Sequence, residues 1–283
     1  MTDLAWAALR IAAFVLVLQA AGVGLFRLTM ARALPASGAP LGAVARRSAL
    51  AALLIVIAQC LIEPAHLGGD FSAVLDPTLG RLAFATSGAE LLTRLAGSAC
   101  LALGAPPGAP PARLLTIAGV TLAVLSFVLT GHAAASRAWL PLTVLLLFHV
   151  AVVSWWLGAL RVLYRAARLE APAQTARALE AFSRVALRLV PAIALAGIAM
   201  AAVLLPDVAS LWRPYGLLLL TKAALFAALM GLAAVNHLVL TPRIAAGTSA
   251  ALETLRGTVL TEYLLMVAAL AATALMTGLY SPS

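Results

Sequence analysis

Apolar runs of about 20 residues recur along the chain, which is the length an α-helix needs to cross the hydrocarbon core of a bilayer. Short polar stretches between them hold most of the Arg and Pro residues. Eight runs are expected as membrane spans, at about 4–26, 48–62, 86–103, 114–130, 139–163, 185–205, 215–239 and 259–280. The pattern predicts an all-α polytopic membrane protein with eight transmembrane helices, built as one integral-membrane domain over residues 1–283.

Two polar stretches are longer than simple turns. Residues 63–85 form an insert, in which a short surface helix is expected from Phe71 to Leu82. Residues 164–184 form a basic, amphipathic segment that is expected to be helical and to continue into the sixth span. Within the third span, Glu90 and Arg94 are four residues apart and can pair on one helix face.

The composition supports a membrane location and the distribution of Arg gives an orientation. The chain is 64% hydrophobic and 10% charged, whereas soluble domains are about 25% charged. Thirteen of the 19 basic residues lie in or beside the loops that follow odd-numbered spans, and three lie in the other loops. The positive-inside rule therefore predicts that both termini and the insert 63–85 are extracytoplasmic, and that segment 164–184 is cytoplasmic.

Several function classes are excluded or disfavoured. The Arg excess acts as a topology signal, so no nucleic-acid partner is expected. Lys222, the only lysine, follows Leu219-Leu220-Thr221 rather than a Gly-rich loop, so the chain lacks the phosphate-binding loop of an ATP-driven pump. The chain is not expected to be an enzyme.

His149 is the deepest of the four histidines. It lies about ten residues into the fifth span, roughly 15 Å below the surface at 1.5 Å per residue. An ionisable residue near the midplane is costly, which makes it a functional candidate, although a neutral imidazole bonded to a neighbouring helix is the structural alternative. Trp156 shares its helix face, and Ser154 with Gly158 forms a small-residue pair that lets another helix approach closely.

His66 and His132 are expected at the outer surface, with Glu63 close to His66. Imidazoles and carboxylates gathered at one mouth can collect a metal cation, and imidazole suits copper, zinc, iron and nickel. The candidate metal ligands are therefore His66, His132, His149, Glu63 and Glu90. His237 is expected at the inner end of its span and is assigned no role.

Lys222 lies about eight residues into the seventh span and needs a partner or a wet cavity there. Glu90 is at a comparable depth and is the expected partner, because Glu262 is placed closer to the inner face.

The chain resembles the copper resistance protein D (CopD) family of bacterial inner-membrane proteins. The motifs that carry the resemblance run from the second span to the C-terminus: Thr86-Ser87-Gly88 with Arg94, Thr130-Gly131-His132, His149 followed by Trp156-Leu157-Gly158-Ala159-Leu160, Tyr215-Gly216-x-Leu218 with Lys222, and Asn236 ahead of Pro242-Arg243. The resemblance implies an eight-span protein that moves copper across the inner membrane, usually inward, often with a small periplasmic copper carrier. His237 stands where the family pattern has Arg.

The sequence and this resemblance together favour a copper-ion permease with an outer site at His66 and His132 and a deep site at His149. The expected partners are copper, the lipid bilayer, a periplasmic carrier and a second copy in a homo-oligomer. Two alternatives stay open: a membrane cytochrome with haem b between two histidines, and a non-transporting scaffold that presents metal to a partner.

Overall fold

The computed structural model describes residues 1–30, 38–105, 110–129, 139–205 and 207–279. Its long helices are α1 (Thr2–Met30), α2 (Gly38–Gly68), α3 (Pro77–Leu103), α4 (Pro110–Leu125), α6 (Trp139–Leu169), α7 (Pro172–Leu204), α8 (Pro214–Val235) and α10 (Ser249–Leu279). Shorter elements are the 3-10 turns η2 (Phe71–Leu75), η3 (Ser126–Val128) and η4 (Ala209–Trp212), the π-helical turn η5 (Asn236–Leu240) and α9 (Thr241–Ala245). The described residues contain helices and no strand.

The predicted fold class is confirmed as an all-α polytopic membrane protein. Seven helical segments of the described chain are long and apolar enough to cross a membrane. The long helix that is not among them is α3, which carries Glu90 and Arg94 in its middle. The total of eight spans therefore stays a prediction.

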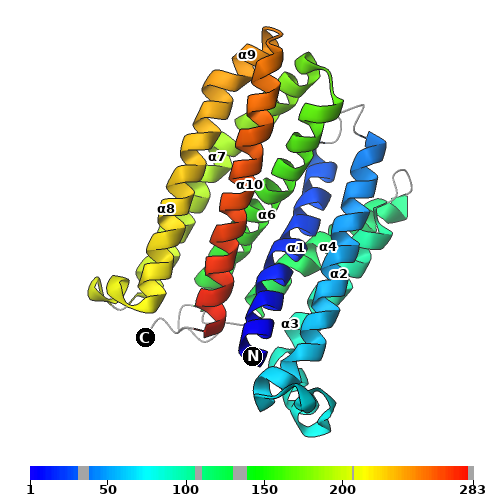
Figure 1. The fold of residues 1–283 in the computed structure, drawn as a ribbon, viewed down its shortest axis with the longest axis vertical. Helices are drawn as coiled ribbons and strands as arrows, with labels where there is room; N and C mark the ends of the chain where they lie inside the picture. The colour runs from blue at the N-terminus through cyan, green and yellow to red at the C-terminus, as the bar shows by residue number, and fades with distance from the viewer. Residues whose placement is uncertain (31–37, 106–109, 130–138, 206, 280–283) are drawn as a thin grey trace.

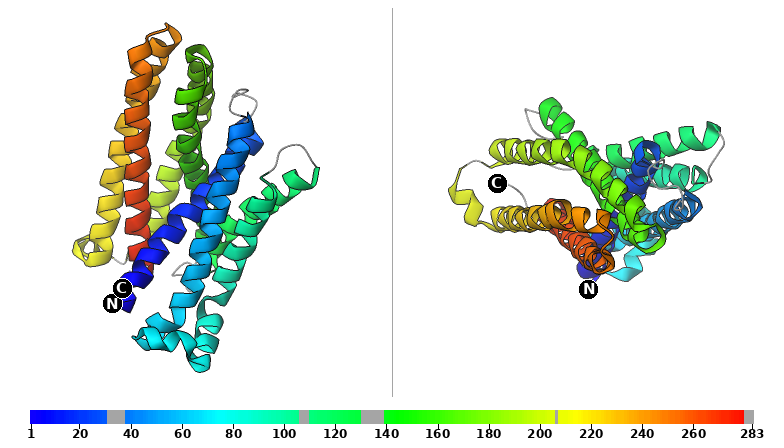
Figure 2. Two further views of the ribbon diagram at one scale, coloured as in Figure 1. Left: turned by 45° about the vertical axis from the view of Figure 1, so that its right-hand side comes forward. Right: turned by 90° about the horizontal axis from the view of Figure 1, so that it is seen from above.

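Helix α1 is the central element of the bundle (Figures 1 and 2). It packs against α2, α4, α6 and α10, while α3 packs between α2 and α4, and α8 packs on α10. The start of α1 and the end of α10 lie at the same end of the molecule as the turn between α2 and α3. We call this the terminal end; the turns from α6 to α7 and from α9 to α10 lie at the opposite end.

The predicted small-residue contact is confirmed between α1 and α6. A Cβ atom added to Gly22 would lie 1.8 Å from the Ser154 carbonyl oxygen, and one on Gly158 would lie 2.1 Å from the Gly22 carbonyl carbon. The two backbones therefore touch, and only glycine fits at either position.

The insert differs from its prediction. Residues 63–68 belong to the last turns of α2, and the expected surface helix from Phe71 to Leu82 is wrong. Asp70 caps the short turn η2, and Asp76 then caps α3 by accepting from the backbone N–H groups of Thr78 and Leu79. With Pro77 in the first position of α3, these caps divide the expected helix in two.

At the opposite end, the basic segment is helical as predicted, but it is broken between α6 and α7 at residues 170–171. Arg256 donates to the Ala167 carbonyl oxygen at 2.7 Å, which satisfies a carbonyl in the last turn of α6. Helix α8 continues past its predicted end through η5 and α9. Pro242 has no N–H to donate to the preceding turn, and the helix widens to a π turn just before it.

Candidate metal site

His66 lies at the terminal end, in the last turn of α2, against the start of α1. Its Nδ1 is 2.9 Å from Oδ1 of Asp3. Its ring stacks on Trp6, with 4.2 Å between ring centroids and 14° between planes. The side chain stays 26% exposed. Because a carboxylate holds Nδ1, Nε2 is the ring nitrogen left to bind an external ligand.

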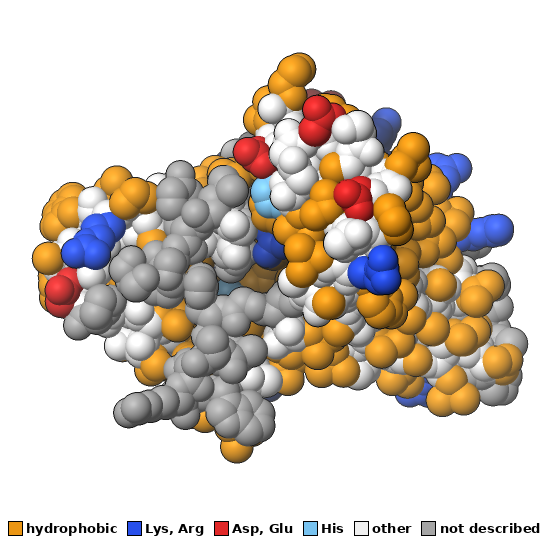
Figure 3. Space-filling view, turned by 90° about the horizontal axis from the view of Figure 1, so that it is seen from below, with side chains coloured by type: hydrophobic (Ala, Val, Ile, Leu, Met, Phe, Trp, Pro, Cys, Tyr) orange, Lys and Arg blue, Asp and Glu red, His pale blue; other side chains and the backbone are white. Residues whose placement is uncertain are grey.

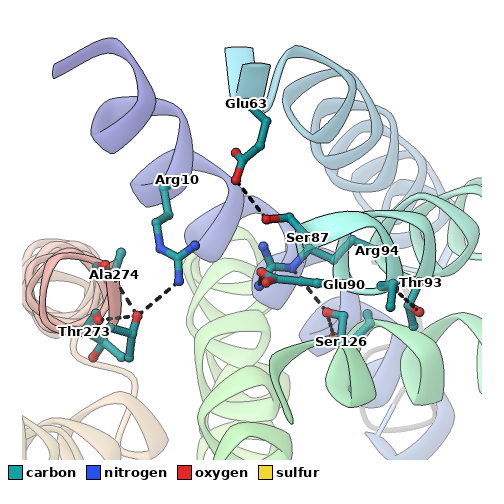
Figure 4. A network of polar contacts seen from close by, with 12 residues as sticks. Arg10, Glu63, Ser87, Glu90, Thr93, Arg94, Ser126, Thr273 and Ala274 are labelled. Carbon is teal, nitrogen blue, oxygen red and sulfur yellow. Dashed lines mark hydrogen bonds and ion pairs between the residues drawn. The ribbon is translucent and has the colours of Figure 1, made fainter. Parts of the chain in front are cut away.

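Glu63 lies one helical turn before His66 and is buried. Its Oε2 accepts a hydrogen bond from Trp6 Nε1 at 2.8 Å, and its Oε1 accepts one from Ser87 Oγ at 2.9 Å; Figure 4 draws the Ser87 bond. The structure thus brings the two expected ligands His66 and Glu63 together around Trp6. Both Glu63 oxygens already have protein partners, which suits a residue that positions Trp6 beneath the His66 ring.

Glu90 and Arg94 form the ion pair that their spacing predicts (Figure 4). The Arg94 side chain is 1% exposed and also donates from Nε to Ser126 Oγ at 3.2 Å. Its guanidinium lies 4.5 Å from the centroid of the Phe127 ring. It also lies 5.4 Å from the centroid of Phe14 on α1, so this buried charge holds α3 against η3 and α1.

The expected pairing of Lys222 with Glu90 is wrong. Glu90 on α3 pairs with Arg94, whereas Lys222 is on α8, which lies on the other side of the molecule from α3 (Figures 1 and 2). Similar depth in the membrane does not bring two residues together when their helices do not pack. In the part of the chain that the structure describes, no carboxylate lies within 4 Å of Lys222.

Arg10 lies between the Glu63 group and α10 (Figure 4). Its guanidinium carbon is 5.3 Å from the Trp6 ring centroid and 5.4 Å from that of Phe14, and its Nη2 is 3.4 Å from Thr277 Oγ1. Figure 3 views the terminal end and shows a basic side chain in a recess beside a histidine, with acidic side chains gathered nearby.

In contrast to the buried Glu63, three acidic side chains of this end are exposed: Asp3, Asp70 and Asp76. Hydrogen bonds from the Ser72 backbone N–H and hydroxyl lower the pKa of Asp70 below its usual value. Asp70 therefore stays ionised at neutral and mildly acidic pH. The exposed carboxylates near His66 can attract a cation locally, although Arg10 and Arg81 lie at the same end.

His149 lies apart from this cluster, about ten residues along α6 from the terminal end, or roughly 15 Å. Its ring faces α7, where a Cβ on Gly197 would be 3.9 Å from Cε1. Lys222 of α8 is close enough to act on it electrostatically. The Nδ1 atom is buried and makes no hydrogen bond of ordinary geometry among the described residues, while the Ile193 backbone of α7 interacts with the ring.

The three histidines that the structure describes lie at three depths. His66 is at the terminal end, His149 is in the middle of α6, and His237 is in η5 near the opposite end. His132 lies outside the described residues. A haem needs two axial ligands facing one iron, and no pair among the described histidines shares a depth. Nor do the described residues contain a group of three or more His, Cys, Asp or Glu placed to hold one metal ion.

Two sets of polar contacts between side chains were not predicted from the sequence. Asp3 and Trp6 contact His66 and Glu63 across about sixty residues of sequence; their spacing of three on α1 was the available signal. A second network joins Asn236, Thr258 and the buried carboxylate of Glu262. The sequence does not reveal that Glu262 faces Asn236 of η5.

Comparisons with known proteins cover most of the chain. The family described as Copper resistance protein D-like, N-terminal domain, matches residues 1–143, and the family described as Copper resistance protein D matches residues 176–276. No curated protein and no solved structure matches the chain. The two matches, in this order along an all-helical membrane protein, assign it a role in copper resistance or transport. The chain belongs to the copper resistance protein D family.

Proposed function

We propose that this protein carries copper ions across the bacterial inner membrane, from the periplasm to the cytoplasm. The observation that carries the proposal is His149, whose Nδ1 is buried in a helix apolar enough to span the membrane and makes no hydrogen bond of ordinary geometry among the described residues, with the Ile193 backbone of α7 beside the ring. A buried polar atom without a hydrogen bond of ordinary geometry is costly. An imidazole nitrogen is a copper ligand, so a passing ion would satisfy it.

The outer site of this proposal is His66 with Asp3, together with His132, which the sequence predicts on the same side of the membrane. The Asp3 carboxylate fixes the His66 ring through Nδ1 and directs Nε2 to the ion. The exposed carboxylates of this end would attract the ion locally, and a small periplasmic copper carrier would deliver it there. Glu63 and Glu90 act in this proposal as positioning residues, since one holds Trp6 and the other holds Arg94.

The outer site (His66 and His132) and the deep site (His149) lie at different depths in the membrane, so their loss should have different effects on copper uptake. In His66→Ala or His132→Ala, capture weakens while the deep step survives, so uptake needs more copper but recovers at high concentration. His149→Ala removes the ligand near the membrane midplane, where the free-energy cost of dehydrating the ion is greatest. High copper should then fail to restore uptake.

The test measures copper uptake against copper concentration in cells that lack other importers, at matched protein levels. Phe148→Ala is the control, because it truncates the neighbouring, lipid-accessible side chain of the same helix. Uptake by His149→Ala equal to that of the parent would refute the proposal. If high copper restored uptake equally in all three histidine variants, the proposal that His66 and His132 capture the ion while His149 carries it across the midplane would be contradicted.

A further inference from the structure

Glu262 on α10 is a carboxylate with 2% of its surface exposed, within a helix apolar enough to span the membrane. Its Oε1 accepts a hydrogen bond from Asn236 Nδ2, in the first residue of the π turn η5. Thr241 Oγ1 donates to the Asn236 carbonyl oxygen at 2.8 Å and so fixes this turn. An ionisable residue at such a site is a candidate for ion or proton traffic.

No described Lys or Arg forms an ion pair with Glu262. From α6, it is approached by Trp156, while Arg161 acts on the neighbouring Tyr263, whose hydroxyl donates to Gln19 of α1. From η5, it is approached by Asn236, and His237 is the next residue. A buried carboxylate surrounded by neutral donors becomes less costly when it takes up a proton.

The hydrogen bonds around Glu262 can be completed in both protonation states. With Glu262 ionised, Asn236 Nδ2 donates to it and Thr258 Oγ1 donates to Asn236 Oδ1, over 2.6 Å. With Glu262 protonated and the Asn236 amide turned over, the acid donates to Oδ1 and Nδ2 donates to Thr258. Thr258 then donates to the Leu255 carbonyl oxygen, 3.0 Å away. In both states Glu262 Oε1, both polar atoms of the Asn236 side chain and Thr258 Oγ1 each keep at least one hydrogen-bond partner.

Glu262 also lies on the route that the proposed function implies. Trp156 is seven residues beyond His149 on the same face of α6, which is roughly 10 Å closer to the opposite end. Trp156 is 2% exposed, and its indole N–H lies beside the Glu262 carboxylate and interacts with it, although outside ordinary hydrogen-bond geometry. The carboxylate is therefore the next ionisable group inward from the deep histidine along this face.

We propose that Glu262 is a reversible proton-binding site that couples copper movement to the pH difference across the membrane. Binding converts the carboxylate to the carboxylic acid, and no other bond changes. Coupling rests on the proposed copper transport, but proton binding at Glu262 can be measured without it.

The first experiment measures copper entry into proteoliposomes of the full chain, with the membrane potential held at zero and a pH gradient imposed in either direction. One pH unit should shift the steady-state copper ratio of the parent by about tenfold per coupled proton. Glu262→Gln should lose this shift. Glu253→Gln, an exposed carboxylate of the same helix, should keep it. The coupling would be refuted if the steady-state copper ratio of the parent did not depend on the pH gradient, or if Glu262→Gln kept the same dependence.

The second experiment follows the carboxylic-acid C=O stretch by infrared difference spectroscopy during a pH titration without copper. A titrating band of a buried carboxyl should be present in the parent and in Glu253→Gln and absent in Glu262→Gln. If the band persists in Glu262→Gln, the proton site is elsewhere. This readout stands even if the parent moves no copper, which would refute the transport proposal alone.

Discussion

The guanidinium of Arg94, 1% exposed, is stabilised inside the bundle by three kinds of contact. Glu90 supplies the opposite charge, Ser126 accepts a hydrogen bond, and the Phe127 ring lies beneath the cation. Each replaces part of the hydration that burial removes. Removing one partner of such a pair costs far more than removing both, because the remaining charge stays buried.

Glu90→Gln should lower the free energy of unfolding in detergent by about 3–5 kcal/mol, the cost of leaving a buried charge uncompensated. Glu90→Gln combined with Arg94→Met should recover part of that loss. Arg81→Met, at an exposed arginine of the same helix, is the control and should change little. A double variant no more stable than the weaker single variant would contradict this account of the pair.

Local spacing predicts some of these residue contacts and not others. The four-residue interval between Glu90 and Arg94 sufficed, because a helix brings such positions onto one face. The bond from Trp6 to Glu63 joins positions 57 apart, and only the packing of α1 on α2 creates it. The expected pair of Lys222 and Glu90 failed for the same reason, since depth says nothing about which helices are neighbours.

At the scale of elements, α1 and α6 form the tightest helix contact that the glycines reveal. Gly158→Ala places a Cβ 2.1 Å from the Gly22 backbone, so the two helices must move apart. We expect a loss of about 1–3 kcal/mol or more in the free energy of unfolding. Gly231→Ala on α8 meets no atom within 4 Å and should be neutral or slightly stabilising, since alanine favours helix. Equal melting temperatures for the two variants would contradict the close contact.

The boundaries of elements follow chemistry that hydropathy does not measure. The apolar runs predicted the membrane helices, and Ser154 with Gly158 predicted the close approach. The division at Asp76 and Pro77 depends on a cap and a proline, and the π turn depends on Pro242 several residues beyond the expected end of the span. These signals are in the sequence, but a window of mean hydropathy averages over them.

At the scale of the whole molecule, the ends of the bundle are chemically different. The start of α1 and the end of α10 share the end that holds His66 and the exposed carboxylates of Asp3, Asp70 and Asp76, and the turn from α9 to α10 lies at the other (Figure 1). Combined with the Arg distribution, this arrangement predicts extracytoplasmic termini. A reporter active only outside the cytoplasm should work after Ser283 and fail after Gly247, in the α9–α10 turn. The reverse pattern would turn the outer site to the cytoplasm and refute inward transport from it.

The most direct test of the account is copper flux through the purified protein. Proteoliposomes that contain a luminal copper indicator are given Cu(I), then Cu(II) and Zn(II), in separate runs with the parent, Phe148→Ala and His149→Ala. We predict copper entry with the parent and with Phe148→Ala, and entry reduced to the level of protein-free vesicles with His149→Ala, while surface binding of copper persists. Copper entry at the parental rate in correctly folded His149→Ala would contradict the account, because the ion would then cross without its midplane ligand.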